Sequence, residues 1–215
     1  MNKINIIFLF FICIFTIFSI LSVKATSSID KKIIVVDPGH GNVDPGCSYG
    51  DIYEKDINLS IGKYLEKELI KNNSKVIMTR NGDYDLALPN ANNRKMSDFN
   101  NRINIINNKD VDMYISIHLN YLNDSSYYGP QVFYNKDNYL LAKTIQEELN
   151  KEFIGNRSIK KIPTNTYMYS KLNKMGVLVE CGFLSNYEER NKLMEEEYQK
   201  LLAKVIVKGI KRYYN

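Results

Sequence analysis

Residues 33–41 read IIVVDPGHG, four β-branched residues that pass directly into a turn. A continuous β-branched run of this kind is typical of a strand that is buried on both faces of a sheet. Downstream of it, short β-like runs alternate with segments of helical periodicity. The predicted strands are 33–36, 75–79, 113–117, 131–134 and 177–179, and the predicted helices are 57–69, 99–106, 139–153, 187–194 and 198–213, with a long polar loop over 81–96. This alternation predicts an α/β fold, a mostly parallel central sheet with helices on both faces, in a single domain.

In a sheet of this type, chemistry gathers at the carboxyl ends of the strands. Three predicted strands are followed there by a polar residue: His40 after the first, His118 after 113–117, and Glu180 after 177–179. His40 and His118 are also the only two histidines of the chain. A lone histidine would more often be a surface or hydrogen-bonded residue. Two histidines at strand ends favour a metal site, because two imidazoles and a carboxylate form a common catalytic zinc site with one coordination position open for water.

The residues alone leave the third ligand open. Glu54 is the favoured candidate, because it precedes the helix 57–69 in a loop that runs directly from the His40 turn. A carboxylate at a helix start also gains from the helix dipole, and on spacing alone a plain capping role explains Glu54 better than a ligand role. Asp44, Asp51 and Asp56 compete for the ligand role.

Period-two alternation along the strands assigns further roles. Ser116, His118 and Asn120 point to one side, so either neighbour of His118 could orient a ligand or the substrate, and Asp37 is a candidate partner for the second nitrogen of a metal-bound histidine. The same alternation directs Glu180 toward the site and Cys181 into the packing between sheet and helices. A glutamate beside a zinc ion can act as the acid and base of a hydrolysis.

The first segment of the chain differs in kind from the rest. A charged start, an apolar run within residues 4–23 and a small-residue ending predict a signal peptide or signal anchor over 1–25, with a catalytic domain over 26–215. The protein is therefore expected to be exported across the cytoplasmic membrane, secreted or held by membrane anchoring through 4–23. The net charge of +5 comes from scattered lysines, and no nucleic-acid-binding module is visible. Cys47 and Cys181 are predicted to be unpaired, with pairing left open.

Four blocks of sequence, at 36–46, 54–59, 116–120 and 179–186, resemble in order the motifs of the zinc-dependent N-acetylmuramoyl-L-alanine amidase family often called Amidase_3. The resemblance implies Zn²⁺ held by His40, Glu54 and His118. It also implies that Glu180 is the catalytic acid/base of a metallo-hydrolase. The substrate that it implies is peptidoglycan, cut at the amide between the lactyl group of N-acetylmuramic acid and L-alanine.

More narrowly, the chain resembles the germination-specific type of spore formers, which implies action on spore cortex as a step toward muramic-δ-lactam. The alternatives are a general vegetative cell-wall amidase, a zinc peptidase acting within the wall peptide, and a wall-binding or scaffold protein. An accessory protein is left open. Before the last block, 169–171 and 175–176 replace an arginine-bearing segment and a Pro-Ala of the family, and Lys171 is the candidate for the basic substrate contact.

Overall fold

The computed structural model describes residues 28–215 of the chain. The predicted signal or anchor over 1–25, including the apolar run 4–23, lies outside the described residues. Within residues 28–215, none of the helices combines the length and the apolar character that a bilayer crossing requires.

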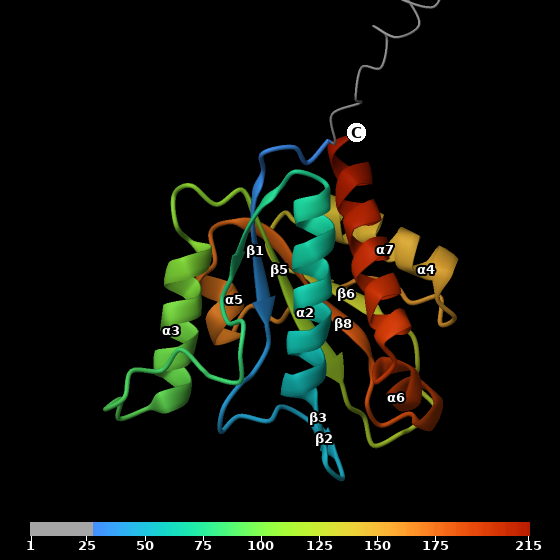
Figure 1. The fold of residues 1–215 in the computed structure, drawn as a ribbon, viewed down its shortest axis with the longest axis horizontal. Coiled ribbons are helices and arrows are strands. Elements are labelled where there is room, and N and C mark those ends of the chain that lie inside the picture. The colour runs from blue at the N-terminus through green and yellow to red at the C-terminus, as the bar shows by residue number, and fades with distance from the viewer. Residues whose placement is uncertain (1–27) are drawn as a thin grey trace, which may run out of the picture.

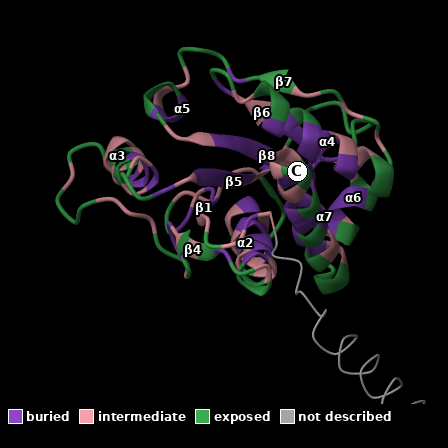
Figure 2. Cartoon of the chain, turned by 90° about the horizontal axis from the view of Figure 1, so that it is seen from above, coloured by how far each residue is buried: buried purple, intermediate pink, exposed green. Residues whose placement is uncertain are grey.

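Six strands form the main sheet in the order β4-β1-β5-β8-β6-β7; Figure 1 labels the four central strands and Figure 2 labels all six. Their bounds are β1 Ile33–Pro38, β4 Lys75–Met78, β5 Met113–Asn120, β6 Gln131–Tyr134, β7 Lys160–Lys161 and β8 Met175–Phe183. Strands β4, β1, β5 and β8 are parallel, whereas β6 is antiparallel to β8 and β7 is parallel to β6. A separate hairpin joins β2 (Ser48–Tyr49) to β3 (Ile52–Tyr53). The predicted α/β class with a mostly parallel sheet is therefore confirmed.

Helices cover both faces of this sheet (Figure 2). On one face, α2 (Glu54–Lys71), α4 (Tyr139–Glu152) and α7 (Glu196–Tyr214) pack over the larger hydrophobic cluster. On the other face, α3 (Arg94–Ile106) and α5 (Tyr167–Lys171) cover a smaller cluster. The short helix α6 (Tyr187–Leu193) follows β8 and leads into α7. One domain with two packed layers around the sheet results, as the alternation of strands and helices predicts.

The pleat of the central strands decides which side chains reach the smaller layer. In β8, Val177, Val179 and Cys181 belong to the larger cluster, and Leu178 belongs to the smaller one. Because successive side chains of a strand point to opposite faces, Glu180 lies on the same side as Leu178. The prediction that Cys181 packs between sheet and helices is confirmed.

Several element ends differ from the expected ones. His118 and Glu180 lie inside their strands, because β5 continues to Asn120 and β8 to Phe183, with a register irregularity in the β5–β8 pairing after His118. Helix α2 begins at Glu54, and α3 begins at Arg94, within the predicted loop. The β2–β3 hairpin, β7 and α5 were not expected. Each of these strands and helices has only two to five residues, which is too few to show a periodicity in the sequence.

Candidate metal centre and active site

The two histidines come together from neighbouring strands. Strands β1 and β5 pair in parallel, with Asp37 opposite Ser116, so the turn after β1 lies beside the end of β5. The imidazole rings of His40 and His118 are 5.1 Å apart between centroids, in an edge-to-face arrangement. The expectation that both rings reach one crevice is thereby met.

Glu54 completes this group as the first residue of α2. Its Oε1 lies 3.2 Å from His40 Nε2 and 3.1 Å from His118 Nδ1. The same oxygen accepts a hydrogen bond from the backbone N–H of Leu119, and Oε2 accepts one from the backbone N–H of Cys47. Burial would raise the pKa of the Glu54 carboxyl, but the two imidazoles hold it well below its usual range. Glu54 is therefore a fixed, ionised group.

The other three carboxylates considered for the third position are placed differently. Asp44 Oδ2 lies 3.0 Å from His40 Nδ1, on the ring nitrogen that does not face Glu54. Asp51 and Asp56 are exposed, and neither belongs to the cluster of possible ligands. Of the candidates, the structure brings only Glu54 to both histidines.

The donor set fits a zinc ion. One ligand atom from each of His40, Glu54 and His118 lies within 4.8 Å of the other two, and no other such cluster occurs in residues 28–215. Two imidazole nitrogens and one carboxylate oxygen are a common catalytic zinc donor set. Burial opposes protonation of His40, yet the carboxylates of Asp44 and Glu54 raise its pKa to about 9. The same negative surroundings favour a divalent cation at this place.

The backbone around the centre is shaped to let these side chains approach. His40 has φ +64°, a left-handed conformation that is strained for a residue with a β-carbon. A β-carbon on Gly39 would lie 2.2 Å from His118 Cε1, and one on Gly46 would lie 2.5 Å from Glu54 Oε2. Both glycines are needed because ligand side chains occupy the space beside them.

Gly39→Ala should therefore displace the His118 ring and weaken zinc binding. We expect a loss of about 1–3 kcal/mol in stability from overpacking, because the added methyl meets a ring held against a strand. Metal content after dialysis and thermal unfolding would measure the two effects. The control is Gly82→Ala, whose β-carbon would meet only the ring of Tyr84, at 3.2 Å. Equal zinc retention by the two variants would contradict the assigned packing.

Two arginines that were not assigned a role hold the His40 turn. Arg102 on α3 donates from Nη2 to the carbonyl oxygen of His40, 2.7 Å away. Its Nη1 donates to the carbonyl oxygen of Pro38 and to the carboxylate of Asp37. Arg80, which follows β4, donates to the carbonyl oxygens of Pro38 and Gly39. Both guanidinium groups are buried. They fix the strained turn by donating charge-assisted hydrogen bonds to its carbonyl groups.

Glu180 stands next to this centre, directly opposite His118 in the register of β5 and β8. Its Oε2 is buried and has no hydrogen-bond partner among the described residues. Burial, together with the negative charge of Glu54, raises the pKa of the Glu180 carboxyl to about 8, against an opposing effect of His40. A carboxyl group with a pKa near neutrality and an unused oxygen is suited to take up and release a proton.

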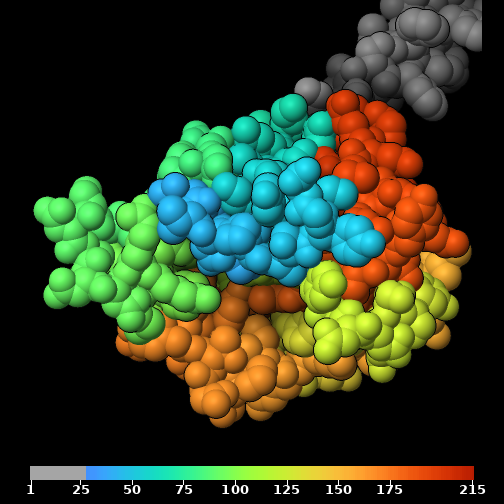
Figure 3. All heavy atoms as spheres, turned by 90° about the horizontal axis from the view of Figure 1, so that it is seen from below, coloured from blue at the N-terminus to red at the C-terminus, as the bar shows by residue number. Residues whose placement is uncertain are grey.

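The centre opens into a groove at the carboxyl end of the sheet. Figure 3 looks onto this end and shows a hollow between the blue-to-cyan segment that contains β2 and β3 and the orange segment before β8. A cavity of about 140 Å³ lies beside the histidines, and its far wall is formed by α3 and α5, with Lys95, Phe99 and Tyr167 among the lining residues. Substrate thus has access to the cluster from solvent.

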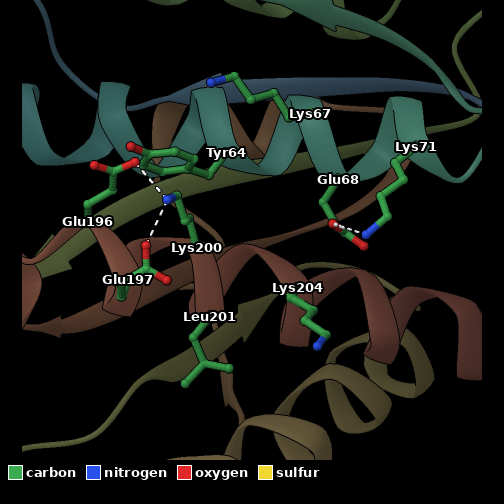
Figure 4. Close-up of a pocket in the computed structure, with 9 residues that line it drawn as sticks. All are labelled: Tyr64, Lys67, Glu68, Lys71, Glu196, Glu197, Lys200, Leu201 and Lys204. Atoms are coloured by element: carbon green, nitrogen blue, oxygen red, sulfur yellow. Dashed lines mark hydrogen bonds and ion pairs between the residues drawn. The ribbon is translucent and has the colours of Figure 1, made fainter.

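A larger hollow lies elsewhere, between α2 and α7 (Figure 4). Figure 4 shows three ion pairs among its lining residues: Lys200 with Glu196 and with Glu197, and Lys71 with Glu68. Its lining contains no histidine and no cysteine. Size alone would point to this hollow, but it has none of the chemistry of the centre at the strand ends.

The remaining sequence candidates take structural positions. Asp37 does not contact either histidine, contrary to the expected partnership, but accepts hydrogen bonds from Thr79 Oγ1, Ser116 Oγ and Arg102. The Lys171 ammonium group donates to the Tyr167 hydroxyl and lies over its ring. The ammonium group therefore contacts Tyr167, which is one of the side chains that line the cavity.

The two cysteines of the described region are free thiols, as expected. Cys181 is fully buried, and Cys47 is half-buried against the larger cluster. Burial raises the pKa of both thiols, and the charges of Glu54 and Glu180 raise it further. Both thiols are therefore held in the protonated form, and neither belongs to the cluster of possible metal ligands.

Comparison with known proteins gives a consistent result. A family described as N-acetylmuramoyl-L-alanine amidase matches residues 34–212. The chain is 37% identical over 192 residues to the germination-specific N-acetylmuramoyl-L-alanine amidase of Bacillus subtilis (strain 168), covering 86% of this chain and 81% of that protein.

Solved structures agree. The chain superposes on the CwlD amidase from Clostridioides difficile, solved in complex with the GerS lipoprotein, with a TM-score of 0.81 and 39% identity, over 85% of this chain and 98% of that one. For the amidase AmiC2 of Nostoc punctiforme the TM-score is 0.74 and the identity 28%, over 85% and 96% of the two chains. Together these matches span the strands and helices that carry the metal-ligand cluster.

Proposed function

The chain belongs to the N-acetylmuramoyl-L-alanine amidase family, and we propose that this peptidoglycan amidase acts on the spore cortex with a zinc ion held by His40, Glu54 and His118. The scissile bond is the amide between the lactyl group of N-acetylmuramic acid and L-alanine. The observation that carries the proposal is the compact His-Glu-His cluster beside the carboxyl group of Glu180, whose buried Oε2 has no hydrogen-bond partner among the described residues.

The ligand atoms proposed for zinc are those that already face one another: His40 Nε2, His118 Nδ1 and Glu54 Oε1. Zinc bound there would supply an activated water and polarise the scissile carbonyl group. Glu54 stays ionised, and its position is fixed by backbone N–H groups from two different segments. The protein thus holds the ligand set in place before metal or substrate arrives.

Glu180 is the proposed acid and base of the reaction. It would accept the proton of the attacking water and return it to the amine of L-alanine as the amide breaks. The support for this role is its position opposite His118, its free Oε2 and its raised pKa. No nucleophilic side chain is required in this scheme.

The spore-cortex role rests on similarity. Both the Bacillus subtilis relative and the CwlD structure are more than 35% identical to this chain, at 37% and 39%. The CwlD amidase was solved in complex with the GerS lipoprotein, which supports the further proposal that an accessory protein contacts this chain. A vegetative wall amidase is the second candidate, because other amidases share the fold.

We further propose that residues 1–25 are a signal peptide or signal anchor and that 26–215 form the catalytic domain. Peptidoglycan lies outside the cytoplasmic membrane, which is where the family acts. The complete sheet and both helical layers are formed within residues 28–215, which supports a domain boundary at this place.

The test is to incubate residues 26–215 and zinc with cortex-type and with vegetative peptidoglycan, and to identify the products by mass spectrometry. Peptides released with a free L-alanine amine, and glycan with unsubstituted muramic acid, are the expected products. A preference for cortex material would support the spore role, and a preference for vegetative wall would support the second candidate. Cleavage within the peptide would contradict the proposed bond.

A further inference from the structure

The second ring nitrogen of His118 faces a residue outside the four sequence motifs. While Nδ1 faces Glu54, Nε2 lies 3.5 Å from the hydroxyl oxygen of Tyr169 on α5. Tyr169 is only 7% exposed, so water does not readily replace this contact. A metal-bound histidine usually donates its other N–H to a carboxylate, a backbone carbonyl or water, which fixes the tautomer and the ring orientation. Here the position of that partner is taken by a phenol.

The contact continues inward to a carboxylate. The hydroxyl groups of Tyr169 and Ser116 are 3.1 Å apart, and Ser116 Oγ lies 2.8 Å from Asp37 Oδ2. Burial raises the pKa of Asp37, but Arg102 and the surrounding hydroxyl groups lower it more, so the carboxylate is ionised.

An ionised carboxylate only accepts hydrogen bonds, and this sets the direction of the whole series. Ser116 must use its single proton toward Asp37, so its oxygen accepts from Tyr169. The Tyr169 proton is thereby committed, and its oxygen is left to accept from His118 Nε2–H. The direction that follows leaves Nδ1 of His118 as the unprotonated nitrogen, which is the nitrogen beside Glu54.

We propose that Tyr169 is a positioning residue that, through Ser116 and Asp37, fixes the tautomer and ring orientation of His118 for metal binding. The inference rests on the proposed zinc site and goes beyond it, since it adds a residue from α5 to the support of a ligand on β5. Arg102 gives the series a second function, because it binds both Asp37 and the carbonyl oxygen of His40. One buried guanidinium therefore links the supports of both histidines.

Helix α5 must be docked for this contact to exist. The carbonyl oxygen of Tyr169 accepts a hydrogen bond of 2.7 Å from Asn135 Nδ2, just after β6. The ring itself packs in the smaller hydrophobic cluster with Tyr114 and Leu178. The docking of a five-residue helix onto the sheet thus completes the surroundings of a metal ligand.

The decisive variant is Tyr169→Phe, which removes one oxygen and keeps the ring. Tyr114→Phe is the matched control: Tyr114 is also a buried tyrosine of the smaller cluster, and its hydroxyl does not contact a ligand. It donates to Asn135 Oδ1, which keeps a second donor in Asn138 Nδ2, so Asn135 still holds α5 in the control. The measurement is zinc affinity of residues 26–215, by competition with a chelator. We expect affinity about 10–100-fold lower for Tyr169→Phe, an intermediate loss for Ser116→Ala, and no change for the control.

A second measurement separates positioning from general destabilisation. The chain has only two histidines, so ¹⁵N imidazole spectra of the zinc-loaded protein resolve the nitrogens of His118. A protonated Nε2 whose shift moves in Tyr169→Phe and not in Tyr114→Phe is expected. Wild-type zinc affinity for Tyr169→Phe would overturn the inference and leave the zinc site standing. A wild-type protein that binds no zinc would overturn both.

Discussion

Glu180→Gln is expected to lower kcat by about 10²–10⁴-fold and to leave the fold and bound zinc in place, because general acid–base catalysis is worth that much. The glutamine amide has the size of the carboxyl group but cannot take up a proton. Oε2 of Glu180 has no hydrogen-bond partner among residues 28–215, so the exchange removes no stabilising contact there. Burial already disfavours the charged form of this group, and a neutral side chain is therefore tolerated.

Glu189→Gln is the matched control for this experiment. Burial raises the pKa of Glu189 too, but its two oxygens accept hydrogen bonds from the backbone N–H groups of Gly129 and Phe183. Its replacement should reduce thermal stability and leave kcat close to wild type. Steady-state kinetics and thermal unfolding of both variants would separate a catalytic glutamate from a structural one. A Glu180→Gln protein with wild-type kcat would disprove the assigned role.

His118→Ala is expected to abolish stable zinc binding and, with it, hydrolysis. Removal of an outer-sphere partner of a ligand costs about 10–100-fold in metal affinity, and removal of one of three ligands should cost more. The fold should persist, because the neighbours Ile117 and Leu119 carry the packing of β5 into the core, and His118 is on the opposite face. Zinc per chain after dialysis, read by elemental analysis, is the direct measurement.

Cys47→Ala tests whether a thiol, rather than an imidazole, binds the zinc ion. The Cys47 thiol is the nearest soft donor by sequence to Glu54, and its backbone N–H already binds that carboxylate. Because the thiol does not belong to the cluster of possible metal ligands, its removal should not change zinc content. Loss of zinc in Cys47→Ala, with retention in His118→Ala, would reverse the assignment of ligands.

The sequence predicts the central strands of the sheet and the meeting of the two histidines at one sheet edge, and both predictions rest on the same kind of signal. Long runs of β-branched residues and helical periodicity are local signals, and parallel strands bring their carboxyl ends to one edge of the sheet. The period of two along β8 likewise separates Glu180 from Cys181 correctly. In each case, information held within a few neighbouring residues is sufficient.

The supporting residues could not be identified in this way. Arg80, Arg102 and Tyr169 reach the site from three different elements, and nothing in their local sequence distinguishes a buried guanidinium or phenol from an exposed one. Asp37 was expected to be the partner of a histidine, but its partners are Thr79 just after β4, Ser116 on β5 and Arg102 on α3. The choice of Glu54 over Asp44 likewise needed the tertiary contact with both rings.

The path of the chain also has a consequence for delivery. Its first described residues lie at the amino end of β1, where Ser28 Oγ donates to the carbonyl oxygen of Lys211 near the end of α7, and Ile29 is fully buried. The groove lies at the carboxyl end of the same strand, six residues and about 20 Å further on. A chain anchored in the membrane through its leading segment, as proposed for residues 1–25, would therefore present its groove on the side of the domain that faces away from the membrane.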